Sequence, residues 1–213
     1  MKGGEAMKSG EATKGGTAMK GGTAMRAHST RFPSISRWLH WSMAVMIVAM
    51  LLIGVGMAAS VSPRYEFLFS IHRPLGIAIF ILAAVRLVNR LVNPPPPLPA
   101  TIPPLQRFAA GASHIVLYAL MFSLPLVGWA MLSAAPYPVV IFGSVRLPAM
   151  LAQNPVLYAW LRHLHRVLAY LLFATFVVHF AAALLHGLIR RDGVFESMAS
   201  WRRHQAGDRA PHD

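Results

Sequence analysis

The sequence predicts an all-α membrane protein, an up-and-down bundle of four transmembrane helices. Of its 213 residues 55% are hydrophobic and only 13% are charged, and the mean hydropathy is +0.50. Four apolar segments reach the roughly 20 residues that a helix needs to cross the hydrocarbon core. The chain lacks the alternating apolar and polar segments of a membrane barrel. Helices, which satisfy their own backbone groups in lipid, are therefore expected.

The four predicted helices are separated by segments unsuited to helix. Between the second and third helices lies NPPPPLPATIPP, in which proline lacks the amide hydrogen that a helix requires. The long connection from Ala134 to about Tyr158 contains APYPVVIFGSVRLPAM and is expected to be irregular. The predicted helices span residues 38–59, 68–92, 108–132 and 160–189.

The distribution of basic residues predicts the orientation of the bundle. Fifteen of the 20 lysines and arginines lie in the two tails and at the second connection, including Arg86 near the end of the second helix. Basic residues favour the cytoplasmic side, so both termini are expected there. The net charge of +13 thus reflects membrane topology, and no nucleic-acid partner is expected. The absence of cysteine excludes disulfides and thiolate metal sites.

Both ends of the chain differ in composition from the middle. Residues 1–27 repeat with a period of six, as in MKGGEA and MKSGEA, and build no apolar face. We therefore expect a disordered, low-complexity basic tail over 1–30, able to contact anionic lipid. The transmembrane domain is expected over 31–200, followed by a cytoplasmic tail over 201–213.

Histidines are placed inside the apolar segments at regular depths. His165 and His179 are 14 residues apart, which brings them to the same helix face, roughly 21 Å apart along the axis. His40 starts the first helix on the cytoplasmic side, and His72 starts the second on the outer side. Matching depths give two pairs, His40 with His179 and His72 with His165. His163 faces elsewhere and is expected at the surface.

An imidazole within the membrane is costly unless it is coordinated or hydrogen-bonded. Two pairs at two depths in a bundle suggest two haems, each held between two imidazoles. Without cysteine the haems are not covalently attached. Hydrogen-bonded core histidines are one alternative, and zinc is another, although four histidines at two depths cannot converge on one ion. Small residues near the pairs leave room for a macrocycle: Gly76, Ala182 and Ala183.

Residues 31–200 resemble the bacterial cytochrome b561 family. The resemblance lies in RWLHW, in IHRPLG followed by VRLVNRLVNPPPPLP, in SHIVLYALMFSLPLVGWAMLSA, and in HRVLAYLLFATFVVHFAAALLH. It implies a four-helix, di-haem, quinone-linked protein of the bacterial inner membrane, in which two b-type haems are ligated by His40, His72, His165 and His179. The best-understood type in this family oxidises superoxide and passes the electron to ubiquinone.

The expected function follows from coordination. An iron with two imidazole ligands has no open position and is suited to outer-sphere electron transfer. We expect electrons to pass between the outer, periplasmic face and a quinone, with superoxide oxidation coupled to ubiquinone reduction as the first hypothesis. A second hypothesis is an electron carrier that serves a separate dehydrogenase or a periplasmic redox protein. A third is a haem-free four-helix transporter.

Further candidate residues lie near each end of the bundle. His186, with Arg190 or Arg191, is expected to line a quinone site, because histidine can donate a hydrogen bond and supply a proton. His114 is a candidate for the same site or for the surroundings of a haem. Helix capping and a hydrogen bond to a haem propionate are alternatives for both histidines.

The outer face carries a group of arginines. Arg73 beside His72 and Arg166 beside His165 are candidate partners of haem propionates. The same group could instead concentrate a small anion such as superoxide, since Glu66 alone opposes it. Its members are Arg64, Arg73, Arg146, Arg162 and Arg166.

Overall fold

The computed structural model of the protein describes residues 32–61, 63–95, 102–136, 140–141 and 145–199. The predicted tails, 1–30 and 201–213, lie outside the described residues, as does the middle of the proline-rich connection. Four described helices are long and apolar enough to cross a membrane, as the sequence predicts. They are α1 (Ser34–Ala58), α2 (Pro63–Val92), α3 (Pro104–Ala134) and α4 (Pro155–Leu184), which continues as the π-helical turn η1 (Leu185–Arg190).

All four helices begin several residues earlier than the sequence predicts. α2, α3 and α4 each start at a proline, which is tolerated in the first helical turn because the amide it lacks would have no partner there. At the start of α4, the side chain of Asn154 accepts a hydrogen bond from the Leu157 amide at 3.0 Å. Prolines that looked like interruptions in the sequence are therefore helix starts.

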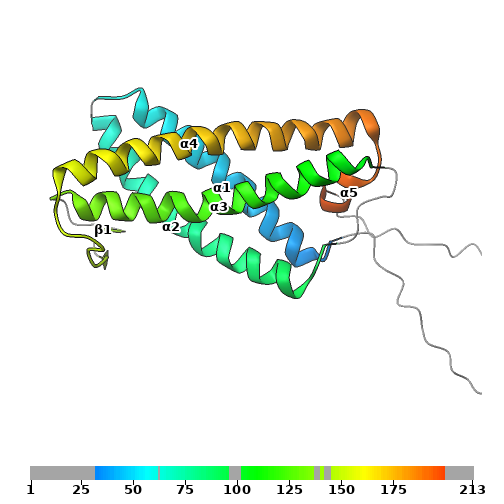
Figure 1. Ribbon diagram of the computed structural model, residues 1–213, viewed down its shortest axis with the longest axis horizontal. Helices are drawn as coiled ribbons and strands as arrows, with labels where there is room; N and C mark the ends of the chain where they lie inside the picture. The colour runs from blue at the N-terminus through cyan, green and yellow to red at the C-terminus, as the bar shows by residue number, and fades with distance from the viewer. Residues whose placement is uncertain (1–31, 62, 96–101, 137–139, 142–144, 200–213) are drawn as a thin grey trace, which may run out of the picture.

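The helices pack as two hairpins. α1 lies against α2 and α3 lies against α4, and the two hairpins cross obliquely (Figure 1). α2 and α3 also contact each other, whereas α1 and α4 have little close backbone contact within the described residues. The first and last described residues lie at one end of the bundle, which is called the terminal end below. At the opposite, hairpin end, β1 (Val140–Ile141) pairs antiparallel with β2 (Val145–Arg146).

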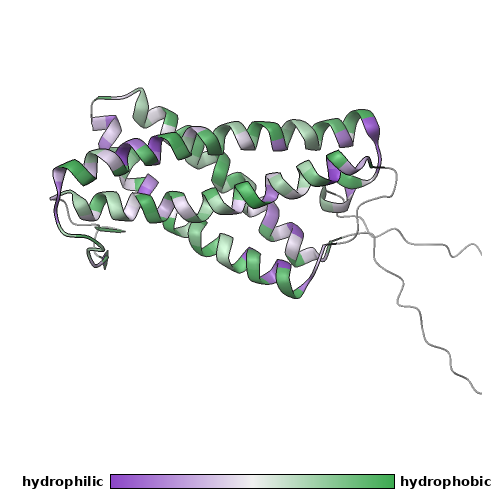
Figure 2. Cartoon of the chain, viewed as in Figure 1, coloured by the Kyte–Doolittle hydropathy of each residue, from purple (hydrophilic) through white to green (hydrophobic). Residues whose placement is uncertain are grey.

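The buried core lies halfway along the bundle. Phe80 of α2 and Phe122 of α3 meet there edge to face, with ring centroids 5.5 Å apart. The outward faces are apolar too: Val45, Leu52 and Val178 are each more than half exposed, and hydrophobic residues run along all four helices (Figure 2). This is the distribution expected of helices surrounded by lipid. The core cluster contains Met43, Ile47, Ile79, Ala83, Leu120, Met121, Leu124 and Leu172.

The last described helix of the chain packs near the start of the first. After η1 the backbone turns with positive φ angles at Arg191 (49°) and Gly193 (83°). Left-handed backbone at Gly193 suits glycine, which has no Cβ to clash. α5 (Val194–Ala199) then lies near the start of α1, where the Trp41 indole N–H donates to the Met198 carbonyl at 3.2 Å. At the terminal end of the bundle α5 is thus held against α1 by this hydrogen bond.

Candidate functional site

Two layers of side chains cross the bundle, one on each side of the core. Each helix contributes one residue to each layer, and these two residues are 14 positions apart in the sequence. They therefore lie on nearly the same face of the helix, roughly 21 Å apart along its axis. The terminal layer consists of His40, Arg86, His114 and His179. The hairpin layer consists of Gly54, His72, Gly128 and His165.

The structure brings the predicted histidine pairs together. The ring centroids of His40 and His179 are 6.5 Å apart, and those of His72 and His165 are 6.2 Å apart. A metal–nitrogen bond is about 2 Å long and an imidazole nitrogen lies about 1 Å from its ring centre, so two imidazoles on opposite sides of one metal ion have centres about 6 Å apart. Both pairs have the spacing of axial haem ligands.

The hairpin layer leaves space around its pair. A Cβ atom at Gly128 would lie 3.4 Å from Cε1 of His165, and one at Gly54 would meet nothing within 4 Å. Nδ1 of His72 is buried and has no hydrogen-bonding partner among the described residues. Glycine on two helices and imidazole on the other two are residue types that would admit and ligate a flat macrocycle.

The terminal layer is more polar. Arg86 donates from Nη2 to Nδ1 of His40 at 2.9 Å. Since arginine only donates, this contact places the His40 proton on Nε2. Coordination through Nε2 therefore requires Arg86 to release Nδ1. His114 lies 5.3 Å from His179 between ring centroids, and its Nδ1 donates to the Ala110 carbonyl at 2.6 Å.

The two arginines predicted to bind propionates differ in their surroundings. The guanidinium of Arg73 lies 4.5 Å from the centroid of the Phe69 ring, and its Nε is buried without a hydrogen-bonding partner in the described structure. Arg166 instead donates to Nδ1 of His163 at 3.0 Å on the exposed side of α4. Arg73 is therefore available to a carboxylate near His72, whereas Arg166 is turned away from His165.

His186 stands in the π-helical turn, one of the rare helix forms that often mark functional sites. Its Nδ1 lies 2.6 Å from a carboxylate oxygen of Asp192, and both side chains are less than one-fifth exposed. Partial burial would raise the pKa of Asp192, but the His186 hydrogen bond and the Val194 amide outweigh it and lower that pKa below its usual value. The carboxylate is therefore ionised at neutral pH and orients the imidazole.

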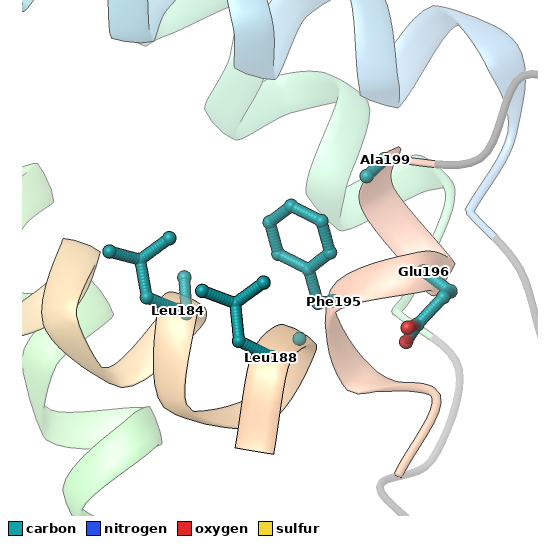
Figure 3. Close-up of a pocket in the computed structure, with 7 residues that line it drawn as sticks. Leu184, Leu188, Phe195, Glu196 and Ala199 are labelled. Carbon is teal, nitrogen blue, oxygen red and sulfur yellow. The ribbon is translucent and has the colours of Figure 1, made fainter. Parts of the chain in front are cut away.

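A cavity of about 270 Å³ lies between the end of α4, η1 and α5; Gly187 and Leu188 of η1 line it, whereas His186 is not among its lining residues. Figure 3 shows the Phe195 ring directed into this space from α5, with Leu184 and Leu188 opposite, while the Glu196 carboxylate points away. The lining is mostly apolar. Arg190, expected beside His186, donates a hydrogen bond to the Gln106 side chain and so links η1 to the start of α3, the other helix of the same hairpin.

Several residues of this arrangement, Gly54 among them, were not expected from the sequence. Arg86, counted there among the topological charges, lies inside the bundle at His40. Gly128 and Asp192 were not selected, although Gly128 follows the same 14-residue spacing as the histidines. Of the small residues expected to admit a macrocycle, Gly76 lies against α1, where its Cβ would be 3.7 Å from Met50 Cε. Ala182 is exposed.

Comparison with known proteins agrees with this arrangement. Residues 31–201 match the family model for prokaryotic cytochrome b561. Cytochrome b561 homolog 2 of Escherichia coli is 30% identical over 171 residues, covering 79% of this chain and 90% of the relative. A probable superoxide oxidase CybB of Yersinia pestis is 27% identical over 166 residues, covering 78% and 93%. Cytochrome b561 homolog 1 of E. coli is 27% identical over 181 residues, covering 81% and 99%. A bundle of four membrane-type helices with two imidazole pairs, together with this match, places the chain in the prokaryotic cytochrome b561 family of membrane electron-transfer proteins.

Proposed function

We propose that this protein is a di-haem b-type cytochrome of the bacterial inner membrane that oxidises superoxide at its hairpin end and reduces ubiquinone at its terminal end. In the proposed topology the hairpin end is periplasmic and both chain termini are cytoplasmic. Two superoxide anions would each lose one electron to give dioxygen, and one ubiquinone would take both electrons and two protons to give ubiquinol. A haem held by two imidazoles supplies one-electron transfer without an open coordination position.

The observation that carries this proposal is the pair of imidazole distances. His40 with His179 and His72 with His165 have centroid separations of 6.5 and 6.2 Å. The pairs lie at two depths, separated by the apolar core. Membership of a cytochrome family explains such spacing better than four independent core histidines would.

Charge supports superoxide as the electron donor. Arg64, Arg146 and Arg162 belong to segments at the hairpin end, and Glu66 is the acidic residue of the described structure in this region. An excess of positive charge around a site raises the encounter rate with a small anion, and added salt weakens that effect. The name of the Yersinia pestis relative, a probable superoxide oxidase, agrees with this substrate.

His186 and Asp192 support quinone chemistry at the terminal end. A quinone carbonyl needs a hydrogen-bond donor, and its reduction consumes protons. With both ring nitrogens protonated, His186 donates through Nδ1 to Asp192 and can donate through Nε2 to a quinone carbonyl, and the apolar cavity lined by Gly187 and Leu188 suits an isoprenoid chain. Asp192 also accepts a hydrogen bond from the Val194 amide at 3.3 Å, which fixes the carboxylate at the start of α5.

A reduced-minus-oxidised spectrum of the purified protein tests the haems. The full chain should show b-type bands, His72→Ala and His40→Ala should each lose about half of the signal, and the double His72→Ala/His179→Ala variant should lose all of it. His163→Ala is the matched control, because His163 is exposed and paired with Arg166. Bands that survive in the double variant would refute the assignment and favour a haem-free transporter.

A second experiment separates the proposed reaction from that of an electron carrier. Superoxide generated outside proteoliposomes should be consumed with reduction of added ubiquinone, and the rate should fall as salt rises. If the haems are reduced only after a dehydrogenase or a periplasmic redox protein is supplied, the protein is an electron carrier and the proposed oxidase reaction is wrong.

A further inference from the structure

The terminal layer contains a buried cation that no part of the proposed function has used. Arg86 occupies on α2 the position at which His72 stands one layer away, 14 residues earlier. Its guanidinium is held between α1 and α3, 2.9 Å from His40 Nδ1 and 5.6 Å from the centroid of the Tyr118 ring. A permanent positive charge within a membrane bundle is costly unless an anion accompanies it.

Nothing anionic in the described structure accompanies Arg86. The acidic residues described are Glu66, at the hairpin end, and Asp192 and Glu196, beyond η1. Asn89, one turn further along α2, bonds the Ser36 hydroxyl at 2.7 Å and contributes no charge. The described residues around the guanidinium therefore supply no anion, and Arg90 adds a second positive charge nearby.

The Tyr118 hydroxyl, a second hydrogen-bond donor near Arg86, also lacks an acceptor in the described structure. The hydroxyl oxygen of Tyr118 is buried and makes no hydrogen bond to any described residue. Arg86 offers several N–H groups and Tyr118 one O–H, and a carboxylate accepts from both kinds of donor. A buried donor without a partner destabilises the folded protein, so an acceptor is expected to complete the site.

We propose that Arg86 and Tyr118 form the carboxylate-binding site of the haem ligated by His40 and His179, and that Arg86 exchanges its contact with His40 Nδ1 for a haem propionate. This inference rests on the proposed ligand pair. The exchange accounts for the tautomer conflict, because His40 can present an unprotonated Nε2 only after Arg86 has left Nδ1. Arg86 is thus a positioning residue that binds the cofactor's carboxylate and permits coordination by its neighbour.

The retained positive charge also favours the reduced cofactor. Reduction adds one negative charge near the guanidinium, and their attraction is strong in a medium of low dielectric. Removing Arg86 should therefore make this haem harder to reduce. The expected effect is a tenfold fall in the ratio of reduced to oxidised haem at a fixed ambient potential, which for a one-electron couple corresponds to about 59 mV.

Redox titration of the full chain tests the inference, in a His72→Ala background that retains only the haem of the terminal layer. Arg86→Gln should produce the tenfold change, Tyr118→Phe a smaller change in the same direction, and Arg86→Lys should restore most of the wild-type ratio. Arg166→Gln is the control, since this exposed arginine pairs with His163 at the other end of the bundle, and it should leave the ratio within twofold.

Reconstitution identifies the anion. The apoprotein is loaded with haem dimethyl ester, whose propionates are blocked. With this ester the His72→Ala protein should show the same lowered ratio of reduced to oxidised haem as the His72→Ala/Arg86→Gln protein shows with haem. Adding Arg86→Gln should not lower the ratio of the ester-loaded protein further. Arg86→Gln could prevent haem from binding at all. In that case the same assignment is supported if Arg86→Lys retains haem and the His72→Ala protein binds the ester only weakly. If the His72→Ala protein gives the same redox titration with and without Arg86→Gln, the proposed role of Arg86 is wrong, although the ligand pair could still stand. Retention of both haems by His40→Ala would instead overturn the ligand pair.

Discussion

Gly128 offers a quantitative test of the hairpin layer. A Cβ atom at this position would lie 3.4 Å from Cε1 and 3.6 Å from Nδ1 of His165. Alanine should therefore be accommodated with a shift of a few tenths of an ångström. Leucine adds three more carbons, the first about 1.5 Å beyond Cβ. Since non-bonded carbons prefer separations of about 3.5–4.0 Å, the imidazole would have to move by more than 1 Å.

Coordination does not tolerate such a displacement, because metal–ligand distances vary by only about 0.2 Å. Gly128→Leu should therefore lose the haem between His72 and His165 and keep the one between His40 and His179. The haem content should fall from about two to about one per chain. Gly128→Ala should keep both haems.

The assay is the haem-to-protein ratio of purified protein, measured by absorbance after alkaline pyridine treatment and compared with the reduced-minus-oxidised spectrum. Gly111→Leu is the matched control in the same helix, since a Cβ there would meet nothing within 4 Å. Two haems with unchanged potentials in Gly128→Leu would show that His165 does not ligate beside this glycine, and the geometric reasoning would fail.

Three further changes have distinct expected outcomes. His165→Ala should lose one haem whereas His163→Ala, two residues away, should lose none, as haem content will show. Gly187→Ala places a Cβ 2.8 Å from Cγ of Phe195; the overpacking should destabilise the docking of α5 by about 1–3 kcal/mol, detectable as faster proteolysis after residue 190 with both haems intact. Asp192→Asn should slow ubiquinone reduction severalfold while haem reduction by superoxide is unchanged, which stopped-flow spectroscopy separates. Because the folded-state pKa of Asp192 is lowered, its contribution to stability should be present above the usual carboxyl pKa and lost as pH falls through the folded value. The Asn variant should lack that dependence in thermal unfolding.

The histidine pairs were predictable because a helix has a constant period. Fourteen residues make almost four turns, so His165 and His179 had to share a face whatever the details of packing. The partners of each pair followed from alternating helix direction. Bundle architecture could be predicted equally well, since four apolar segments of sufficient length leave few arrangements in lipid.

Arg86 and Gly128 obey the same period but carry ambiguous chemistry. An arginine near a helix end is usually a topological charge, and only the hydrogen bond to His40 distinguishes this one. Glycine is common in membrane helices for many reasons, and its contact with His165 depends on how closely α3 approaches α4. The contact of Asp192 with His186 could not be predicted for another reason. It depends on a π-helical turn and on the left-handed backbone of Arg191, and hydrophobic periodicity predicts neither.

The pairing of helices gives the ligand pairs a second consequence. His40 and His179 belong to different hairpins, as do His72 and His165, and α1 and α4 barely touch in the described structure. Each ligand pair therefore spans the seam between two halves of the protein. If the chain were divided in the connection between α2 and α3 and the halves were expressed as separate polypeptides, each would insert as a self-contained hairpin. The contacts between α2 and α3 would favour their reunion, and under the proposed ligation each haem would add a bond from either half, so that haem supply would promote assembly.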